Sequence, residues 1–403
     1  MSKSSGSWLK LGVCTAAVLA IATAVYRLAF GNVDGFVRTI DHCEQLFCDF
    51  RNVYYPSAKT LLLVGLPLRT YYYPLTLAAL LSVLPRHVAD PQVRVLWGIL
   101  QVAASAALVG VPFLAFLKRS VGQWGFALGA FLLSAPVLHN FKWGQVSVLV
   151  NLGVLVAFAA GTAGMPFLGG ASLAVAITLK PHSAIALFYF IVRKDFRFVG
   201  ACAVSVVVLG LLVPIALLGP SATFQSYPVI ARQVEEAVRT WVPTDDNSQF
   251  LVHVVTRTVS PAAAAFLRAP MMWLGLGLLF VNLVLVVRLA RRSLRDEMPL
   301  ALMLLFLSQP LFVPTSWPHH LSYLPLVQAM LLERVTNGSG PVRATKLFVL
   351  LLSVLLSSLA LPVLLGWQVY ARAGSLFLSN ALLLVLLYLE LLAKGTPHSA
   401  VET

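Results

Sequence analysis

Long apolar runs recur from one end of this chain to the other, and they constrain its fold more than any other feature. A helix needs about 20 mainly apolar residues to span a bilayer. Runs long enough to enter or cross a membrane lie at 8–30, 93–117, 122–138, 145–161, 165–179, 182–193, 198–218, 269–289, 298–315, 319–333, 346–367 and 374–393. The chain is 59% hydrophobic, only 11% charged and has a mean hydropathy of +0.85, which excludes a soluble globular domain. We therefore predict an all-α, polytopic membrane protein with about 12 transmembrane helices, in a single domain over residues 1–403.

The basic residues are arranged like charges that flank membrane helices. The formal net charge is +14, but the lysines and arginines form short clusters between apolar stretches and do not make a basic domain. This arrangement argues against nucleic-acid binding and predicts contact with membrane lipids.

One short segment decides the predicted topology. The apolar part of Tyr71–Pro85 is about a dozen residues long, which is too few to span a bilayer. If this segment is re-entrant or lies flat at the interface, the short basic clusters fall on the side of the N-terminus, as the positive-inside rule requires. We then expect a retained first helix over Trp8–Phe30, cytoplasmic termini, and long outer loops at 31–92 and 220–268.

The first outer loop holds the acids that could do chemistry. The candidate acids are Asp34, Asp41, Glu44 and Asp49. Asp49 stands out because the stretch that it begins also holds Arg51 and the phenols Tyr54 and Tyr55. A carboxylate here could act as general base for a sugar hydroxyl, and the arginine could pair with a phosphate. The same residues could also be solvated loop charges.

Two further polar breaks lie on the same predicted face. His319 and His320 begin an apolar run, and adjacent side chains on a helix point in different directions, so at most one of them need enter a site. Both could instead sit at the headgroup level, as Trp and His often do. Lys180 precedes a proline that breaks the helix and frees backbone groups, which suits a phosphate. The alternative is a lysine that extends to the interface.

The remaining polar candidates are amides. Gln145 begins a helix, where its amide could bind sugar hydroxyls or simply cap the helix. Asn247 and Gln249 end the polar run 241–249, which could close over an acceptor or be an ordinary solvated loop. Since all these groups face the outer side in the predicted topology, we expect chemistry on one side of the membrane.

The cysteines suggest a local crosslink at most. Cys43 and Cys48 could form a disulfide if their loop faces an oxidising compartment, and a zinc site that includes His42 is the alternative. Cys14 and Cys202 lie in apolar runs and are interpreted as packing residues. The sequence holds no Walker-type loop and no dinucleotide fingerprint, so an activated substrate would have to arrive by another route, such as a lipid carrier.

Taken in chain order, these residues resemble the GT-C superfamily of polytopic glycosyltransferases, and specifically glycosyltransferase family 87. That family includes polyprenyl-phosphate-mannose-dependent mannosyltransferases and related arabinofuranosyltransferases. The matching landmarks cover about 50–320: Asp49 to Tyr55 with Ala58, Gly65–Leu68, Tyr73–Leu75, Gly144–Val146, Lys180–Pro181, Ser316–Trp317 with His319 and His320, and loosely Asn247–Gln249. The family often has Pro-Pro where this chain has Pro74-Leu75, and Asp where it has Pro318.

The resemblance implies a GT-C-like fold, with a re-entrant or interfacial helix in the first outer loop, and an inverting transfer at the plasma membrane on its periplasmic or extracellular face. The donor would be a hexose, with mannose the first candidate, or a pentose on polyprenyl phosphate, and the acceptor a glycolipid or glycan. Asp49 would be the base, and His319 or His320 would position the donor phosphate or the base. The donor would be held by Arg51, Tyr54, Tyr55, Arg69, Gln145 and Lys180, and the acceptor by Asn247 and Gln249.

No cofactor or metal is expected, since the lipid-linked sugar is itself a substrate. A transporter or flippase of a lipid-linked sugar is the alternative function. Transporters usually show internal repeats and polar groups at the membrane midplane. The sequence shows no repeat, and its polar groups gather on one predicted face, which favours the transferase.

Overall fold

The structure, a computed structural model, describes residues 39–41, 43–117, 121–292, 297–337 and 342–395. Within these ranges the chain folds into helices, and the only β-type contact found there is an isolated bridge between Ser134 and Ser358. The predicted all-α class is confirmed. The predicted first helix, 8–30, lies outside the described residues, as do Cys14, Asp34 and His42.

Four helical units in the described part of the chain are long and apolar enough to cross a membrane. They are α5 (Asp90–Ala115), the continuous unit of α11 (Phe196–Val207), η4 (Val208–Leu212) and α12 (Val213–Leu218), α15 (Pro261–Arg292), and α22 (Ser375–Gly395). A fifth is obtained if α7 (Ala135–Trp143) and α8 (Ser147–Thr162), which are bent by 119° at their break, count as one span. The chain is thus a membrane protein, but the predicted number of about 12 spans is not confirmed.

The other apolar runs form shorter helices because polar residues and prolines interrupt them. Lys180 separates α9 (Pro166–Leu179) from η3 (Pro181–Ala186), where a proline lacks the amide hydrogen that would continue the helix. The remaining pieces are α6 (Val121–Leu132), α10 (Leu187–Val192), α16 (Met298–Leu307), α17 (Gln309–Phe312), η7 (Pro318–Leu321), α18 (Leu324–Asn337), α19 (Val342–Leu356), α20 (Ala360–Leu365) and α21 (Trp367–Arg372).

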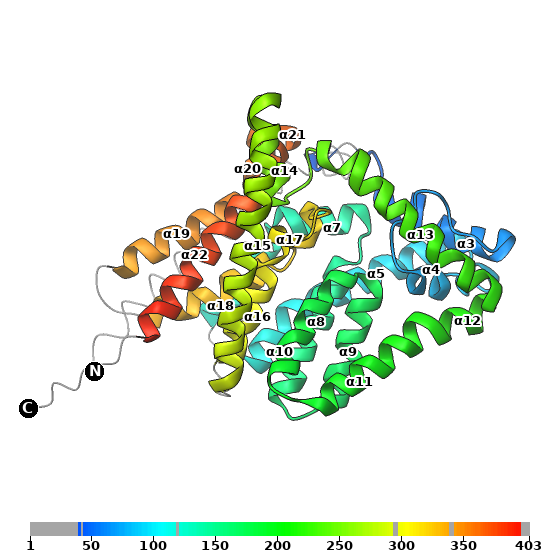
Figure 1. Cartoon of the computed structure of the whole chain (residues 1–403), viewed down its shortest axis with the longest axis horizontal. Helices are drawn as coiled ribbons and strands as arrows, with labels where there is room; N and C mark the ends of the chain where they lie inside the picture. Colours follow the sequence, from blue (N-terminus) through cyan, green and yellow to red (C-terminus); the bar gives the residue numbers. More distant parts are fainter. Residues whose placement is uncertain (1–38, 42, 118–120, 293–296, 338–341, 396–403) are drawn as a thin grey trace, which may run out of the picture.

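The two predicted outer loops are largely helical. The first contains η1 (Phe50–Tyr54), α3 (Tyr55–Val64), α4 (Leu75–Leu81) and η2 (Leu84–Arg86). The second contains α13 (Pro220–Thr240), η5 (Val242–Thr244) and α14 (Leu251–Arg257). With seven residues, nearly all buried, α4 is too short to span a membrane, as predicted for 71–85. Figure 1 shows α13 along the outside of the molecule, running from α12 near α4 back toward α14.

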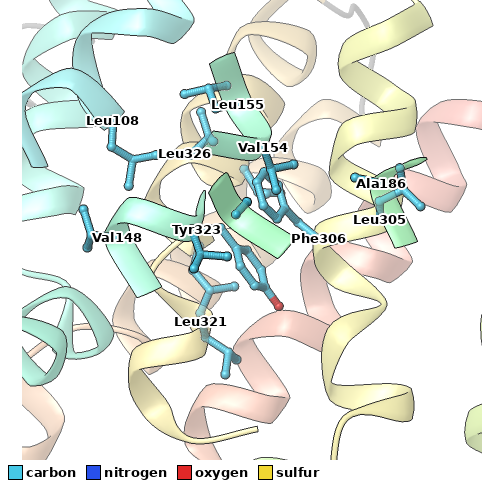
Figure 2. Packing of buried hydrophobic residues seen from close by; sticks show 14 of the residues in the cluster. Leu108, Val148, Val154, Leu155, Ala186, Leu305, Phe306, Leu321, Tyr323 and Leu326 are labelled. Carbon is cyan, nitrogen blue, oxygen red and sulfur yellow. The ribbon is translucent and has the colours of Figure 1, made fainter. Parts of the chain in front are cut away.

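Central packing joins α5, α8, α16 and α18. Figure 2 shows Leu108, Leu155, Phe306, Tyr323 and Leu326 in this cluster, which is buried from solvent and from the outside of the bundle. The rings of Phe306 and Tyr323 lie 5.0 Å apart with planes 12° from parallel. Because lipid is as apolar as these side chains, close packing and interhelical hydrogen bonds hold such helices together in a membrane.

One such hydrogen bond fixes the turn that carries the two histidines. The amide of Asn151 on α8 donates to the hydroxyl of Ser322, which directly follows η7, at 2.8 Å, and both side chains are buried. The η7 turn is thereby held against α8 and α7, at the end of the bundle where α14, α17 and α21 also lie in Figure 1.

Candidate active site

Asp49 lies at the start of η1 and is held by two side chains from other elements. Gln145 donates a hydrogen bond from its Nε2 atom to Oδ2 of Asp49, and the hydroxyl of Tyr73 lies 3.4 Å from the same oxygen. The amide of Gln145 also donates to Tyr73 at 2.8 Å and accepts from Tyr54 at 2.8 Å. Burial raises the pKa of the Asp49 carboxyl to about 7, against the attraction of Lys180 and these hydrogen bonds.

The position of Gln145 depends on a glycine. Gly144 has a φ of 63°, in the left-handed region, and lets the chain turn by 119° between α7 and α8. A Cβ atom at this position would lie 3.0 Å from Cα of Phe47 and 3.0 Å from Cβ of Phe50. Only glycine therefore allows the segment that carries Asp49 to pack against the break that carries Gln145.

Two cavities meet beside Asp49. The first has a volume of about 480 Å³ and is lined by three carboxyl groups, those of Asp41, Asp49 and Asp245. The second has a volume of about 430 Å³ and is lined at its polar end by Lys180, His182 and His320. Both cavities share a wall made by Tyr72, Tyr73 and Trp317.

The linings of the two cavities differ in chemistry. Three indole rings face the first cavity, from Trp143, Trp241 and Trp317, and no lysine or arginine of the described residues lines it. The second cavity extends from its cationic end along apolar side chains of α13, which include Ile230, Ala231 and Val234. The first therefore suits a polyhydroxylated ring, and the second suits an anionic group with an apolar tail.

The two adjacent histidines enter different cavities. His319 lines the first and His320 lines the second, although both belong to η7 and both are almost fully buried. Adjacent side chains point in different directions, as predicted, and here each of the two lines a cavity. Nε2 of His319 and Nδ1 of His320 are buried without a hydrogen-bond partner in the protein. Each ring can therefore contact a ligand.

Lys180 lies over the ring of Tyr73, whose hydroxyl faces Asp49. Its ammonium group donates to the hydroxyl of Ser147 at 2.8 Å and lies 5.8 Å from the centre of the Tyr73 ring. The side chain is only 4% exposed, so an interfacial lysine pointing to solvent is not what the structure shows. A base and a buried cation thus flank one tyrosine.

Several predicted site residues lie elsewhere. Arg51 and Arg69 line neither cavity. Tyr55 turns toward α5, where its hydroxyl donates to Asp90 at 2.9 Å. Gln249 is fully buried and connects its own segment, before α14, to α21 and α22. Its side-chain amide donates to the carbonyl of Ala371 and accepts from the backbone amide of Phe377. Asn247, in contrast, does line the first cavity.

The structure also adds residues that were not among the predicted contacts. Tyr73 touches both Asp49 and Gln145, and the only sequence signal for it was its place in the aromatic-Pro-Leu step. His139 lines the first cavity from α7, and Asp245 accepts a hydrogen bond from Nε1 of Trp317 at 2.7 Å. Nothing in the spacing of an isolated histidine inside an apolar run separates such a residue from a packing histidine.

The cysteines of the first loop form a disulfide. Cys43 and Cys48 are bonded, with their Cα atoms 6.6 Å apart, directly before Asp49. Cys202 is a buried free cysteine, as its place in an apolar run predicted. Among the residues that the structure describes, no group of three or more His, Cys, Asp or Glu side chains is placed to hold a metal ion.

Comparison with known proteins identifies the family to which this arrangement belongs. The sequence model of glycosyltransferase family 87 matches residues 70–316. A relative from Mycolicibacterium smegmatis, named polyprenol-phosphate-mannose-dependent alpha-(1-2)-phosphatidylinositol mannoside mannosyltransferase, is 28% identical over 219 residues. The match covers 51% of this chain and 46% of the relative, so the chain spans less than half of that protein's length. No solved structure gives a significant match.

The family match extends over more than half of the chain and includes the break at Gly144-Gln145, Lys180 and the wall residue Tyr73. Asp49, His319 and His320 lie outside the matched range, and only the structure connects them to it. The chain belongs to glycosyltransferase family 87.

Proposed function

We propose that this protein transfers a sugar, with mannose the first candidate, from polyprenyl phosphate to a hydroxyl of a glycolipid or glycan, with inversion at the anomeric carbon. The observation that carries the proposal is the pair of cavities that meet at Tyr73, with a carboxyl group on one side and a buried cation on the other. The name of the M. smegmatis relative supports both the donor and the kind of acceptor.

The donor is assigned to the second cavity. Lys180 can pair with the phosphate of the donor, and the imidazole ring of His320 can donate a hydrogen bond to a phosphate oxygen. The apolar side chains of α13 give the polyprenyl chain a surface that runs away from the charged end. Arg51 and Arg69 line neither cavity, so their predicted phosphate contacts have no support from this geometry.

The acceptor is assigned to the first cavity. Indole faces bind the apolar faces of sugar rings, while carboxylates and the amide of Asn247 can bind hydroxyls. Three carboxyl groups without a lining cation disfavour an anionic group at this point. The reacting end of the acceptor is therefore a neutral sugar or polyol ring.

The transfer step follows from these positions. Asp49 takes the proton of the acceptor hydroxyl while the hydroxyl oxygen forms a bond to the anomeric carbon. The bond between that carbon and the phosphate oxygen breaks, and polyprenyl phosphate leaves with the electron pair and is stabilised by Lys180. We propose that the acceptor hydroxyl attacks from the face opposite the phosphate, which inverts the configuration at the anomeric carbon.

We further propose the plasma membrane as the location, with the site on its periplasmic or extracellular face. The disulfide directly before Asp49 supports this side, because disulfides persist in oxidising compartments. The charge distribution along the sequence supports the same side.

The test is transfer by the purified protein in lipid, with polyprenyl-phosphate-[14C]mannose as donor and an alkyl mannoside or a glycolipid as acceptor. We expect a new glycosidic bond whose anomeric configuration, read by NMR, is opposite to that of the donor. Retention would refute the inverting step. Movement of labelled sugar-lipid across a liposome membrane without any new bond would instead support the transporter.

A further inference from the structure

We propose that Asp41 and His139 are positioning residues that fix the ring of His319, so that its Nε2 atom accepts a hydrogen bond from a sugar hydroxyl in the first cavity. This inference rests on the proposed function, and it adds to it a chain of side chains that ends at the substrate. This series of contacting side chains starts on α21, continues through the loop after η5 and the segment before η1, and reaches η7 by way of α7. Its members, in order, are Trp367, Asn247, Asp41, His139 and His319.

The direction of the chain is set at its outer end by Trp367. An indole Nε1–H can only donate, and it lies 2.8 Å from Oδ1 of Asn247, so that atom must be the carbonyl oxygen of the amide. The NH2 group of Asn247 then points the other way, and it donates to Oδ2 of Asp41 at 3.0 Å. The orientation of the amide, which is otherwise ambiguous, is thereby fixed.

The next two links follow from the carboxylate. Oδ2 of Asp41 also lies 3.5 Å from Nε2 of His139, too far for a hydrogen bond, but a carboxylate at this distance repels a lone pair, so the hydrogen of this ring is expected on Nε2. The rings of His139 and His319 are both buried, at 3% exposure each, which disfavours the charged imidazolium form of either ring. A neutral His139 with hydrogen on Nε2 has a lone pair on Nδ1.

That lone pair sets the form of His319. Its Nδ1 lies 3.4 Å from Nδ1 of His139, so His319 must hold its hydrogen on Nδ1 and donate it. The ring centres are 5.3 Å apart with planes 21° from parallel, so the rings are stacked, and their two Nδ1 atoms are within hydrogen-bond distance of each other. Nε2 of His319 is therefore left with a lone pair.

This Nε2 atom is where a ligand would enter. It is buried and has no hydrogen-bond partner in the protein, and His319 lines the first cavity together with Asp49. A buried acceptor without a partner is destabilising, and a sugar hydroxyl in this cavity would relieve that cost. A sugar hydroxyl that donates to Nε2 of His319 directs its hydrogen toward His319 and away from Asp49. The sugar ring is thereby held so that a different hydroxyl faces Asp49.

The variant that tests the chain is Asp41→Asn. Its neutral amide no longer repels a lone pair on Nε2 of His139, so the hydrogen of His139 is not held on Nε2 and the form of His319 is no longer fixed. We expect kcat for mannosyl transfer to an alkyl mannoside to fall roughly 10- to 100-fold, the effect of one misplaced buried hydrogen bond. His319→Leu should show a loss at least as large. In the double variant, Asp41→Asn should add less than about twofold, since its effect runs through His319.

A panel of monodeoxy alkyl mannosides provides a readout that a merely structural role would not change. Wild type should use one member of the panel roughly tenfold more slowly than the parent, because that member lacks the hydroxyl bound by His319. Asp41→Asn and His319→Leu should no longer discriminate against it. Losses that multiply in the double variant, or unchanged discrimination in Asp41→Asn, would overturn the proposal.

Two further variants keep the test decisive. If Asp41→Asn does not fold, Trp367→Phe keeps an aromatic ring beside His139 but removes the donor that orients Asn247. It should reduce kcat severalfold in wild type and leave the His319→Leu rate unchanged; a loss in both backgrounds would contradict the chain. Asp246→Asn is the matched control, because Asp246 lies in the loop that carries Asn247 but lines neither cavity. This variant should behave as wild type. If wild type itself transfers no sugar, the proposed function fails and not this inference alone.

Discussion

The pH dependence of transfer follows directly from the surroundings of Asp49. Burial raises the pKa of its carboxyl to about 7, while Lys180 and hydrogen bonds from Tyr73 and Gln145 act in the opposite direction. A base must be ionised to accept a proton, so activity should rise as the pH rises through this value. With a pKa of about 7, roughly 9% of the carboxyl is ionised at pH 6 and roughly 91% at pH 8.

The expected result is therefore a roughly tenfold increase in kcat between pH 6 and pH 8. It is measured as transfer of labelled mannose at saturating donor and acceptor. A carboxyl with its ordinary pKa would be fully ionised over this range and would give a flat profile. Tyr73→Phe removes a hydrogen bond that favours the carboxylate, so the midpoint should move to higher pH.

A flat wild-type profile would refute this account of the base, and so would the same slope in Asp49→Asn. A midpoint that moves to lower pH in Tyr73→Phe would contradict the assigned role of the tyrosine hydroxyl. Glu44→Gln is the matched control, since Glu44 is an exposed acid of the same loop and should leave both rate and profile unchanged.

Three other predictions concern the donor, the turn and the disulfide. Lys180→Met should raise the KM for the polyprenyl-phosphate donor roughly 10- to 100-fold, measured by initial rates, whereas Lys59→Met at the exposed pair with Asp90 should not. Gln249→Ala should lower the free energy of unfolding by about 1–3 kcal/mol in a melting assay, because this amide joins α21 and α22. The KM for the acceptor should stay unchanged. A normal melting temperature with a raised KM would instead support the predicted contact of Gln249 with the acceptor. Loss of the crosslink in Cys43→Ser/Cys48→Ser should cost about 2 kcal/mol of stability, and no change in melting temperature with or without reductant would contradict it.

The sequence was sufficient to predict the helical class and the family, and the hydrogen bond between Gln145 and Asp49 joins two residues that were predicted to share a site. Apolar periodicity and the positions of polar breaks are local properties of a sequence. Residues at breaks on one face of a helical bundle lie near one another in space. The short segment α4 was also predictable, since its length alone excludes a span.

The number of spans and the details of the site were not predictable from the sequence. Some apolar runs predicted as single helices are broken in the structure, as 298–315 is between α16 and α17 and 346–367 is between α19 and α20. Arg51 and Tyr55 share a short stretch with Asp49, yet successive positions of a helical turn point in different directions, so only part of that stretch reaches the cavities. Tyr73 and His139 depend on contacts between distant segments, which no local pattern reveals.

The central claim is that Asp49 removes the proton of an acceptor hydroxyl during sugar transfer. Its most direct test is single-turnover transfer from polyprenyl-phosphate-[14C]mannose by wild type, Asp49→Asn and Glu44→Gln in lipid, with binding of the donor measured in parallel. The account predicts that Asp49→Asn binds the donor normally but transfers at least roughly 100-fold more slowly, while Glu44→Gln matches wild type. Transfer by Asp49→Asn at the wild-type rate would contradict it.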